Sequence, residues 1–307
     1  MTGLDIAVTD LSKSFGTVDA VTDLTFRAEP GRVTGFLGPN GAGKSTTLRA
    51  LVGLVRPTAG TALIGGRAYH QLVRPATQVG VHLEAAFHPG RTGREHLRAL
   101  APLVGVDDAR CDEALARVDL ADAADRRVGG YSLGMRQRLG LATALLGAPS
   151  VLILDEAANG LDPAGIKWLR DFLRGFAAEG GTVLLSSHVL SEVEQTVDDV
   201  VIISQGRLRH QSSLAELRSQ VNDYVVVRSP HGDRLADFAA TRFPQSHRIV
   251  SAGEAHIVGV SAAEVGSAAF ADGLELHELS TSGDSLEDVF LRLTAVQAES
   301  TSEEVAA

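Results

Sequence analysis

The sequence contains very little cysteine and no long apolar segment, and each absence excludes a class of protein. Cys111 is the only cysteine among 307 residues, which excludes an intramolecular disulfide and favours a cytosolic chain. The longest stretch without a charged side chain, 139–154, has 16 residues, too few to cross a bilayer. No basic start followed by an apolar core indicates a signal peptide. We therefore expect a cytoplasmic, globular chain.

Lysine is also scarce, and charge is unevenly distributed along the chain. Only three of the 28 Lys and Arg residues are lysines, at positions 13, 44 and 167. Residues 1–219 carry 23 basic and 24 acidic side chains, whereas residues 220–307 carry 5 and 14. The acidic second part argues against a nucleic-acid partner and indicates a domain boundary near residue 220. We expect one domain over 1–219, a small accessory or regulatory domain over 220–298 and a disordered tail over 299–307.

One of the three lysines stands in the most informative segment of the chain. Residues 38–46 fit the pattern G-x-x-x-x-G-K-[ST] of a phosphate-binding loop. Glycines let backbone N–H groups close around phosphate oxygens, the lysine reaches the outer phosphates and a hydroxyl holds Mg²⁺. An apolar strand is expected before the loop, and a helix after it would place its N-terminus beneath the phosphates. The candidate ligands are Gly38, Pro39, Asn40, Gly41, Ala42, Gly43, Lys44, Ser45 and Thr46.

Strands and helices alternate through the rest of the first part. Apolar runs at 151–154, 182–187 and 200–203 predict buried strands, and the segment 4–33 predicts antiparallel strands. Ser132 and Asp162 are expected to cap two helices. A helical subdomain is expected to include 93–120, with Leu97, Leu100, Leu103 and Val104 turned inward. These patterns together predict an α/β domain with a largely parallel core sheet.

The second part has its own alternation of strands and helices. Its expected order is β-α-β-β-α-β followed by a last helix, which predicts a small α+β domain of ferredoxin-like type. The expected elements cover 223–229, 233–243, 246–251, 255–260, 262–270, 274–280 and 285–296.

Four segments beyond the phosphate-binding loop follow one another in a specific order and at specific spacings. The run 151–156 ends in Asp155 and Glu156, where the first carboxylate would hold Mg²⁺ and the second would polarise the attacking water. It follows Tyr-Ser-Leu-Gly-Met at 131–135 and precedes Asn-Gly-Leu-Asp-Pro at 159–163 and Ser-Ser-His at 186–188. In this order the segments resemble the Walker B strand, signature, D-loop and switch histidine of ABC transporter ATP-binding subunits. The resemblance covers 4–215, and details that include 285–291 resemble bacitracin- and daunorubicin-resistance export ATPases.

The resemblance implies roles for individual residues. Lys44, Glu156 and His188 would be the catalytic side chains. Phe15 would stack on the adenine. Three further residues would touch nucleotide at a site shared with a second copy of the chain: Ser132 and Gly134 of the signature, and Asp162 of the D-loop. The signature departs from the usual Leu-Ser-Gly-Gly-Gln at three positions but keeps its hydroxyl and its glycine.

Glu84 is the weakest match to the family pattern. It stands where these ATPases carry a glutamine that ligates Mg²⁺. A glutamate could also be a ligand, but it would add a negative charge beside the phosphates. The implied metal ligands are therefore Ser45, Asp155 and Glu84, with ATP and Mg²⁺ as the bound species.

The implied function is an ATP-hydrolysing subunit of an exporter of drugs, antibiotics or lipid-like molecules. Two copies would sandwich ATP and drive a polytopic membrane-spanning partner on a separate chain, with 87–92 as the docking region. The chain would then lie peripherally on the inner face of the cell membrane. One alternative is a soluble ABC ATPase of DNA repair or translation, but the sequence has neither a long coiled coil nor two ATPase domains. A second is a GTPase or kinase, although the guanine-binding pattern N-K-x-D is missing. A protein that binds without turnover is a third, disfavoured by Glu156 and His188.

Overall fold

The structure is a computed structural model that describes residues 3–84, 87–219, 223–283 and 285–295. The described chain divides into two compact units. One consists of residues 3–214 and 292–295, and the other of Ala215–Leu291. The tail 299–307, expected to be disordered, lies outside the described residues. Among the described helices, none combines the length and the apolar character needed to cross a bilayer.

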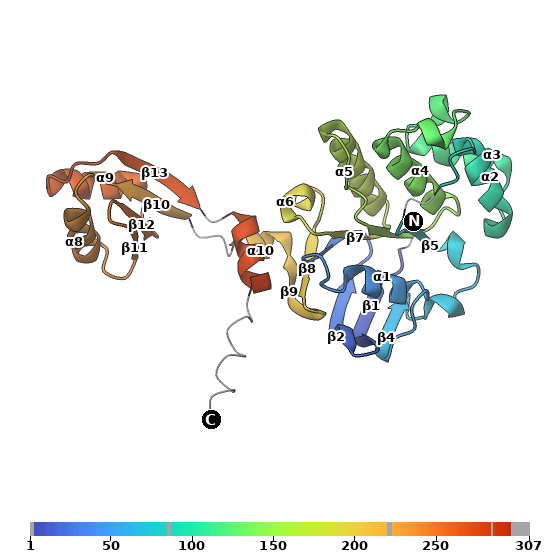
Figure 1. Ribbon diagram of the computed structural model, residues 1–307, viewed down its shortest axis with the longest axis horizontal. Helices are drawn as coiled ribbons and strands as arrows, with labels where there is room; N and C mark the ends of the chain where they lie inside the picture. Colours follow the sequence, from blue (N-terminus) through green and yellow to red (C-terminus); the bar gives the residue numbers. More distant parts are fainter. Residues whose placement is uncertain (1–2, 85–86, 220–222, 284, 296–307) are drawn as a thin grey trace. The chain divides into compact units, whose positions relative to one another are not determined.

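Two sheets form the framework of the first unit (Figure 1). The smaller is antiparallel in the order β2-β1-β4, and the larger has the order β5-β6-β7-β3-β8-β9. All neighbours in the larger sheet are parallel except β8 and β9. The predicted parallel core and the antiparallel strands before it are thus confirmed. The strands are β1 (Ile6–Phe15), β2 (Val18–Ala28), β3 (Val33–Leu37), β4 (Ala59–Ile64), β5 (Val79–His82), β6 (Val151–Asp155), β7 (Thr182–Ser187), β8 (Asp199–Ser204) and β9 (Arg207–Ser213).

Helix α1 (Lys44–Leu51) joins the two sheets through a shared apolar core. Leu48 and Leu51 are fully buried, in a cluster that includes Ile6 of β1 and Phe36 of β3. All five residues of β3 are buried, as expected for a central parallel strand covered on both faces. Because α1 is anchored in this core, it holds in place the phosphate-binding loop that precedes it.

The remaining helices of the first unit include a group formed by α2, α3 and α4 (Figure 1). The stretch 93–120, expected to be helical, contains two α-helices, because Gly105 takes the left-handed conformation at φ 78° and ends α2. The inward position expected for Leu103 is wrong, since its side chain is 82% exposed. The buried face of α2 repeats every four residues, and Leu103 lies on the opposite side. These helices are α2 (Gly93–Val104), α3 (Asp108–Arg117), α4 (Leu133–Leu145), α5 (Pro163–Ala178) and α6 (Leu190–Val193). The next helix, α7 (Leu214–Ser219), begins at the last residue of this segment of the first unit and continues into the second.

Both expected N-caps are confirmed. The hydroxyl of Ser132 accepts a hydrogen bond from the backbone N–H of Met135 at 3.2 Å, at the start of α4. A carboxylate oxygen of Asp162 accepts from the N–H of Gly165 at 2.8 Å, at the start of α5. Each cap satisfies a backbone donor that has no partner within the helix.

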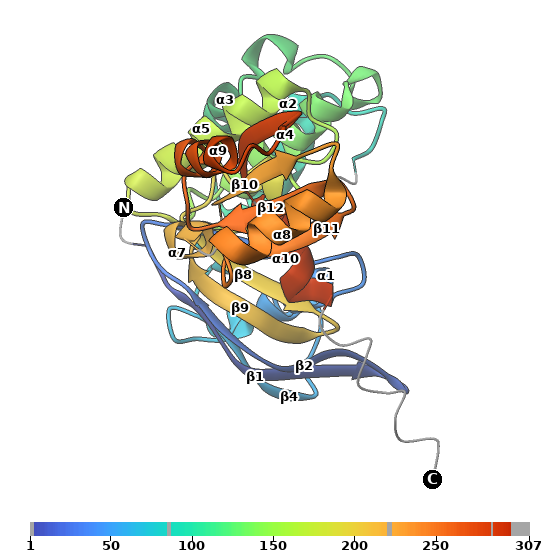
Figure 2. The same ribbon diagram turned by 90° about the vertical axis from the view of Figure 1, so that its left-hand side faces the viewer.

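The second unit is a four-stranded antiparallel sheet in the order β11-β12-β10-β13. Helices α8 and α9 pack on one face of it, where Phe238 and Val265 share a core with Val225 and Ile257 (Figure 2). The β-α-β-β-α-β order is as expected, and its ferredoxin-like character stays a prediction. The last strand begins at Glu278 rather than at 274. The elements are β10 (Asp223–Arg228), α8 (Gly232–Arg242), β11 (His247–Ser251), β12 (Glu254–Val258), α9 (Ala262–Ala271) and β13 (Glu278–Gly283). Helix α10 (Leu286–Ala295) begins in this unit, and its residues from 292 on belong to the first.

Candidate functional site

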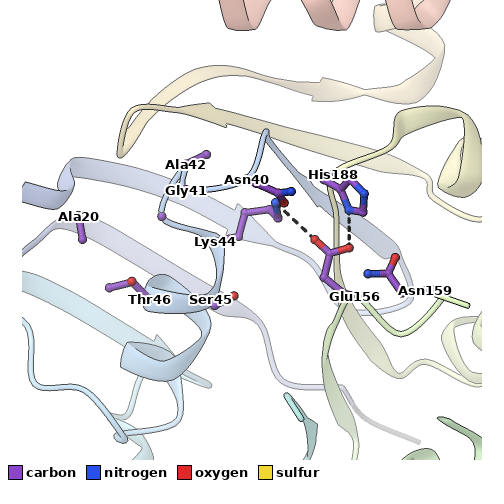
Figure 3. Close-up of a pocket in the computed structure, with 11 residues that line it drawn as sticks. Ala20, Asn40, Gly41, Ala42, Lys44, Ser45, Thr46, Glu156, Asn159 and His188 are labelled. Atoms are coloured by element: carbon purple, nitrogen blue, oxygen red, sulfur yellow. Dashed lines mark hydrogen bonds and ion pairs between the residues drawn. The ribbon is translucent and has the colours of Figure 1, made fainter. Parts of the chain in front are cut away.

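The candidate site lies where β3, β6 and β7 end, at the carboxyl edge of the parallel sheet. These strands are neighbours in the order β6-β7-β3, so the segments that follow them meet at this edge. Open parallel sheets commonly bind ligands at this position. A cavity of about 380 Å³ lies here (Figure 3). Its lining residues are Ala20, Asn40, Gly41, Ala42, Gly43, Lys44, Ser45, Thr46, Glu156, Asn159 and His188.

The loop between β3 and α1 needs glycine at two crowded positions. A Cβ atom at Gly38 would lie 2.4 Å from the carbonyl oxygen of Ile203, and one at Gly43 would lie 2.5 Å from that of Ala20. Gly43 also has φ 101°, which side chains rarely tolerate. Since Gly43 precedes α1 and has no side chain to cap it, the first N–H groups of the helix are suited to an anion at the cavity.

Lys44 is held at the start of α1 by the loop itself. Its ammonium donates to the carbonyl oxygens of Gly38 at 2.6 Å and Pro39 at 3.3 Å, and its side chain is only 6% exposed. The same Nζ atom lies 3.4 Å from Oε1 of Glu156. The other carboxylate oxygen, Oε2, lies 2.8 Å from Nδ1 of His188 (Figure 3). Lys44, Glu156 and His188, expected to be catalytic, thus form one connected group.

Ser186 orders the two acidic residues that follow β6. Its hydroxyl donates to a carboxylate oxygen of Asp155 and accepts from the backbone N–H of Glu156 at 3.0 Å. Glu156 has φ 52°, a left-handed conformation that costs a non-glycine residue roughly 1–2 kcal/mol. The backbone turns sharply here, and the carbonyl of Glu156 accepts from the N–H of Asn159 at 3.0 Å. Because of this turn, Glu156 faces Lys44 and Asn159 also lines the cavity.

The oxygen donors near the cavity suit Mg²⁺. The hydroxyl of Ser45 lines the cavity and the carboxylate of Asp155 ends the neighbouring strand β6. Hydroxyl and carboxylate oxygens are ligands that Mg²⁺ prefers, and this ion usually keeps waters and binds phosphate oxygens as well. Among the residues that the structure describes, no three His, Cys, Asp or Glu side chains form a metal-binding group. The donor set therefore fits an ion shared with a phosphate ligand.

Glu84 lies away from this group in the structure. Its side chain is 69% exposed and forms an ion pair with Arg49 of α1. Glu84 does not line the cavity. The structure thus supplies a partner for Glu84 that the sequence pattern did not indicate.

Phe15 lies at the end of β1, on the hairpin whose second strand brings Ala20 to the cavity. The ring is 51% exposed, and the ammonium of Lys13 lies 4.7 Å from its centroid. An exposed ring at this position is free to meet a flat ligand.

The signature residues Ser132 and Gly134 and the D-loop residue Asp162 do not line the cavity of their own chain. Ser132 and Gly134 begin α4, and Asp162 caps α5. Asn159 is the member of this segment that lines the cavity, a position sequence reasoning missed. Its signal was weak, because a polar residue three positions after Glu156 is common in turns.

His82 is a buried titratable residue that the sequence did not single out. It ends β5, is 5% exposed, and its Nε2 atom lies 2.7 Å from Oε1 of Gln137 in α4. Burial lowers the pKa of His82, while Gln137 and the charge of Asp155 raise it to a lesser extent. The net effect favours a neutral imidazole.

Comparison with protein families gives two matches. A family described as ABC transporter matches residues 21–159, which contain the phosphate-binding loop, the signature and the acidic pair. A domain family of unknown function matches residues 223–287, most of the second unit.

Similar proteins span most of the chain. The bacitracin transport ATP-binding protein BcrA of Bacillus licheniformis is 35% identical over 300 residues, 94% of this chain and 96% of that protein. The lantibiotic transport ATP-binding protein SrtF of Streptococcus pyogenes is 36% identical over 204 residues, 66% of this chain and 88% of that protein. A solved structure of an ATP binding subunit of an ABC transporter is 30% identical, with a TM-score of 0.63, and the match covers 70% of this chain and 92% of that one.

Proposed function

Since this chain belongs to the ABC transporter ATP-binding proteins, we propose that it hydrolyses ATP at a dimer interface to drive export through a separate membrane-spanning partner. The observation that carries this proposal is the group of Lys44, Glu156 and His188 beside the glycine loop. A cation, a carboxylate and an imidazole meet there at a helix N-terminus suited to phosphate.

The loop residues bind and orient the nucleotide. Backbone N–H groups at 40–45 and the ammonium of Lys44 would contact the phosphates. Because Lys44 pairs with Glu156 in the structure, phosphate and carboxylate compete for the same ammonium, and a phosphate at Lys44 frees the carboxylate for another contact. Mg²⁺, held by Ser45 and Asp155, would neutralise charge on the phosphates.

Glu156 accepts a proton from the attacking water, or orients that water, in this proposal. A carboxylate fixed at the end of a buried strand can act as a general base if water reaches it. His188 orients Glu156 by donating from Nδ1 to its carboxylate, and its other ring nitrogen would donate a hydrogen bond to the terminal phosphate when each ring nitrogen carries a proton. Phe15 would stack on the adenine from the neighbouring hairpin.

A second copy of the chain completes the site in this proposal. Ser132 and Gly134 form a capped helix N-terminus that would meet the terminal phosphate bound by the other copy. Asp162 and Asn159, on the segment between β6 and α5, would lie at the same interface. Glu84 would approach the metal only after leaving its ion pair with Arg49.

The relatives support the proposed membrane partner and indicate a class of cargo. BcrA is a bacitracin transport protein and SrtF a lantibiotic transport protein, which favours a peptide antibiotic or a similar drug as cargo. The segment 87–92 would dock on the permease, placing the chain on the inner face of the membrane. DNA repair or translation is disfavoured, because relatives that cover most of the chain are transport proteins.

The accessory domain is a separate part of the proposal. All residues that line the cavity lie between positions 20 and 188, in the first unit. We assign the acidic second unit a regulatory or dimer-stabilising role rather than a part in nucleotide binding.

The test compares two lysine variants in the complex with the membrane partner. Lys44→Ala should abolish ATP hydrolysis and transport, because it removes the buried cation at the loop. Lys167→Ala removes an exposed lysine of α5 and should leave both activities at the parent level. Hydrolysis that survives Lys44→Ala would contradict the proposal.

A further inference from the structure

An arginine of α4, the helix that begins at the signature and is called the signature helix below, contacts both an aromatic ring and a carboxylate. The guanidinium carbon of Arg138, in α4, lies 4.3 Å from the ring centroid of Trp168 in α5. One of its nitrogens, Nη1, also donates to Oδ2 of Asp119 at 2.8 Å. The side chain of Arg138 is 19% exposed. A cation held over an indole and shielded from water is attracted more strongly than an exposed one.

The aromatic contact continues along α5. Trp168 stacks on Phe172, one helical turn later, with ring centroids 5.7 Å apart and planes at 22°. The guanidinium of Arg117, at the end of α3, lies 6.0 Å from the Phe172 ring. Two arginines therefore cover one aromatic pair, but only Arg138 belongs to the helix that begins at Ser132.

A second contact ties α4 to the sheet. Gln137, next to Arg138, bonds His82 of β5 at 2.7 Å. The helix approaches closely, since a Cβ atom at Gly140 would lie 2.2 Å from the His82 ring. Only about 10 Å³ of space remains between these contacts and Trp168, about the least that one water needs. Helix α4 is thus fixed on one side to β5 and on the other to α5.

The two helices joined by Arg138 both start at segments proposed to meet a second copy. Helix α4 starts after Ser132, and α5 starts after the segment that carries Asn159 and Asp162. We propose that Arg138 and Trp168 form a positioning pair that holds the signature helix at the angle needed by the ATP site of the other copy. This inference rests on the proposed function, because it needs a shared site.

The pair acts on the partner's site, so binding and turnover should respond differently. Arg138→Met keeps a long side chain but removes the charge over the indole. It should leave nucleotide affinity unchanged, because the loop of the same chain is intact, and should lower kcat in the membrane complex by about tenfold. Arg138→Lys keeps a cation but loses the planar fork that also reaches Asp119, so its kcat should be intermediate.

A matched control and a spectroscopic signal separate positioning from general damage. Arg117→Met removes the other arginine of the same aromatic pair, outside α4, and should leave kcat near the parent value. Trp168 is the only tryptophan of the chain, so its fluorescence reports on the surroundings of this one ring. Quenching by acrylamide should increase in Arg138→Met and stay near the parent level in Arg117→Met.

The decisive experiment mixes the impaired variant Arg138→Met with the inactive variant Lys44→Ala in the complex with the membrane partner. A dimer of Arg138→Met and Lys44→Ala has one site with an intact loop from the first and an intact signature from the second. The mixture should hydrolyse ATP faster than either variant alone. Activity no higher than that of the separate variants would overturn the inference, as would parent-level kcat in Arg138→Met. If Arg138→Met does not fold, Arg138→Lys takes its place in the mixture. Hydrolysis by Lys44→Ala alone would instead refute the proposed function, and the inference with it.

Discussion

The Nδ1 atom of His188 lies 2.8 Å from Oε2 of Glu156, although 32 positions separate the two residues. They meet because β6 and β7 are parallel neighbours and the segments that follow them leave the same edge of the sheet. This contact fixes the direction of the carboxylate, whose other oxygen faces Lys44. The proposed catalytic group is thus a product of the strand order.

Glu156→Gln should separate nucleotide binding from hydrolysis. The amide keeps the shape of the side chain but cannot accept the proton, so turnover should fall by about a hundredfold or more. ATP affinity should be retained. Glu179→Gln, an exposed position at the end of α5, is the matched control and should hydrolyse ATP like the parent. Near-normal turnover of Glu156→Gln with the membrane partner would remove this residue from the proposed role.

Substitutions at Glu84 test whether this side chain serves the metal or only Arg49. An exposed ion pair contributes about 1 kcal/mol or less, so neither Glu84→Gln nor Glu84→Ala should unfold the chain. If Glu84 approaches Mg²⁺ during turnover, Glu84→Gln should keep measurable ATPase activity and Glu84→Ala should uncouple transport from hydrolysis. The Mg²⁺ dependence of both activities is the measurement. Parent-like transport in both variants would make the position structural.

The buried His82 predicts that stability falls in mild acid. Burial lowers its pKa below the ordinary value of 6.5, so between these two values the unfolded chain binds a proton that the folded chain does not. The contribution of His82 is complete above about pH 7 and is lost as the pH falls below 6.5. Urea unfolding at pH 7.5 and 5.5 should show a smaller difference in unfolding free energy for His82→Gln than for the parent. Equal differences would contradict this account.

Removing the residues after 219 tests the accessory domain. The cavity residues all precede this point, so ATP affinity should stay close to that of the full chain. The cut also removes the bond from the Ser204 hydroxyl to the carbonyl of Thr294, which should lower stability modestly. Loss of ATP binding in a folded, shortened chain would refute the separation. An unchanged fraction of dimer would refute a role in dimerisation. The remaining interpretation would then be a domain that packs only on the ATPase core of its own chain.

Local signals made the core and the main motifs predictable. Continuous apolar runs identified β6 and β7, and the caps at Ser132 and Asp162 set where two helices begin, because a cap depends on neighbours within three residues. The glycine loop was readable for the same reason, since its crowding and its positive φ angles exclude side chains.

Contacts between distant residues were not predictable. The pairs Arg49–Glu84 and Arg138–Trp168 join side chains 35 and 30 positions apart, and their formation depends on how helices pack rather than on a local pattern. Leu103 was misplaced because a row of apolar residues can satisfy more than one helical face.

The molar mass of Glu156→Gln in solution, measured by light scattering with and without ATP, tests the central claim that two copies share the nucleotide. The account predicts a doubling of molar mass when ATP is added, because the bound ATP is not consumed and each signature meets the other copy's phosphates. Adding Lys44→Ala to the same chain should abolish the doubling. A molar mass that stays that of one chain at saturating ATP would contradict the shared site.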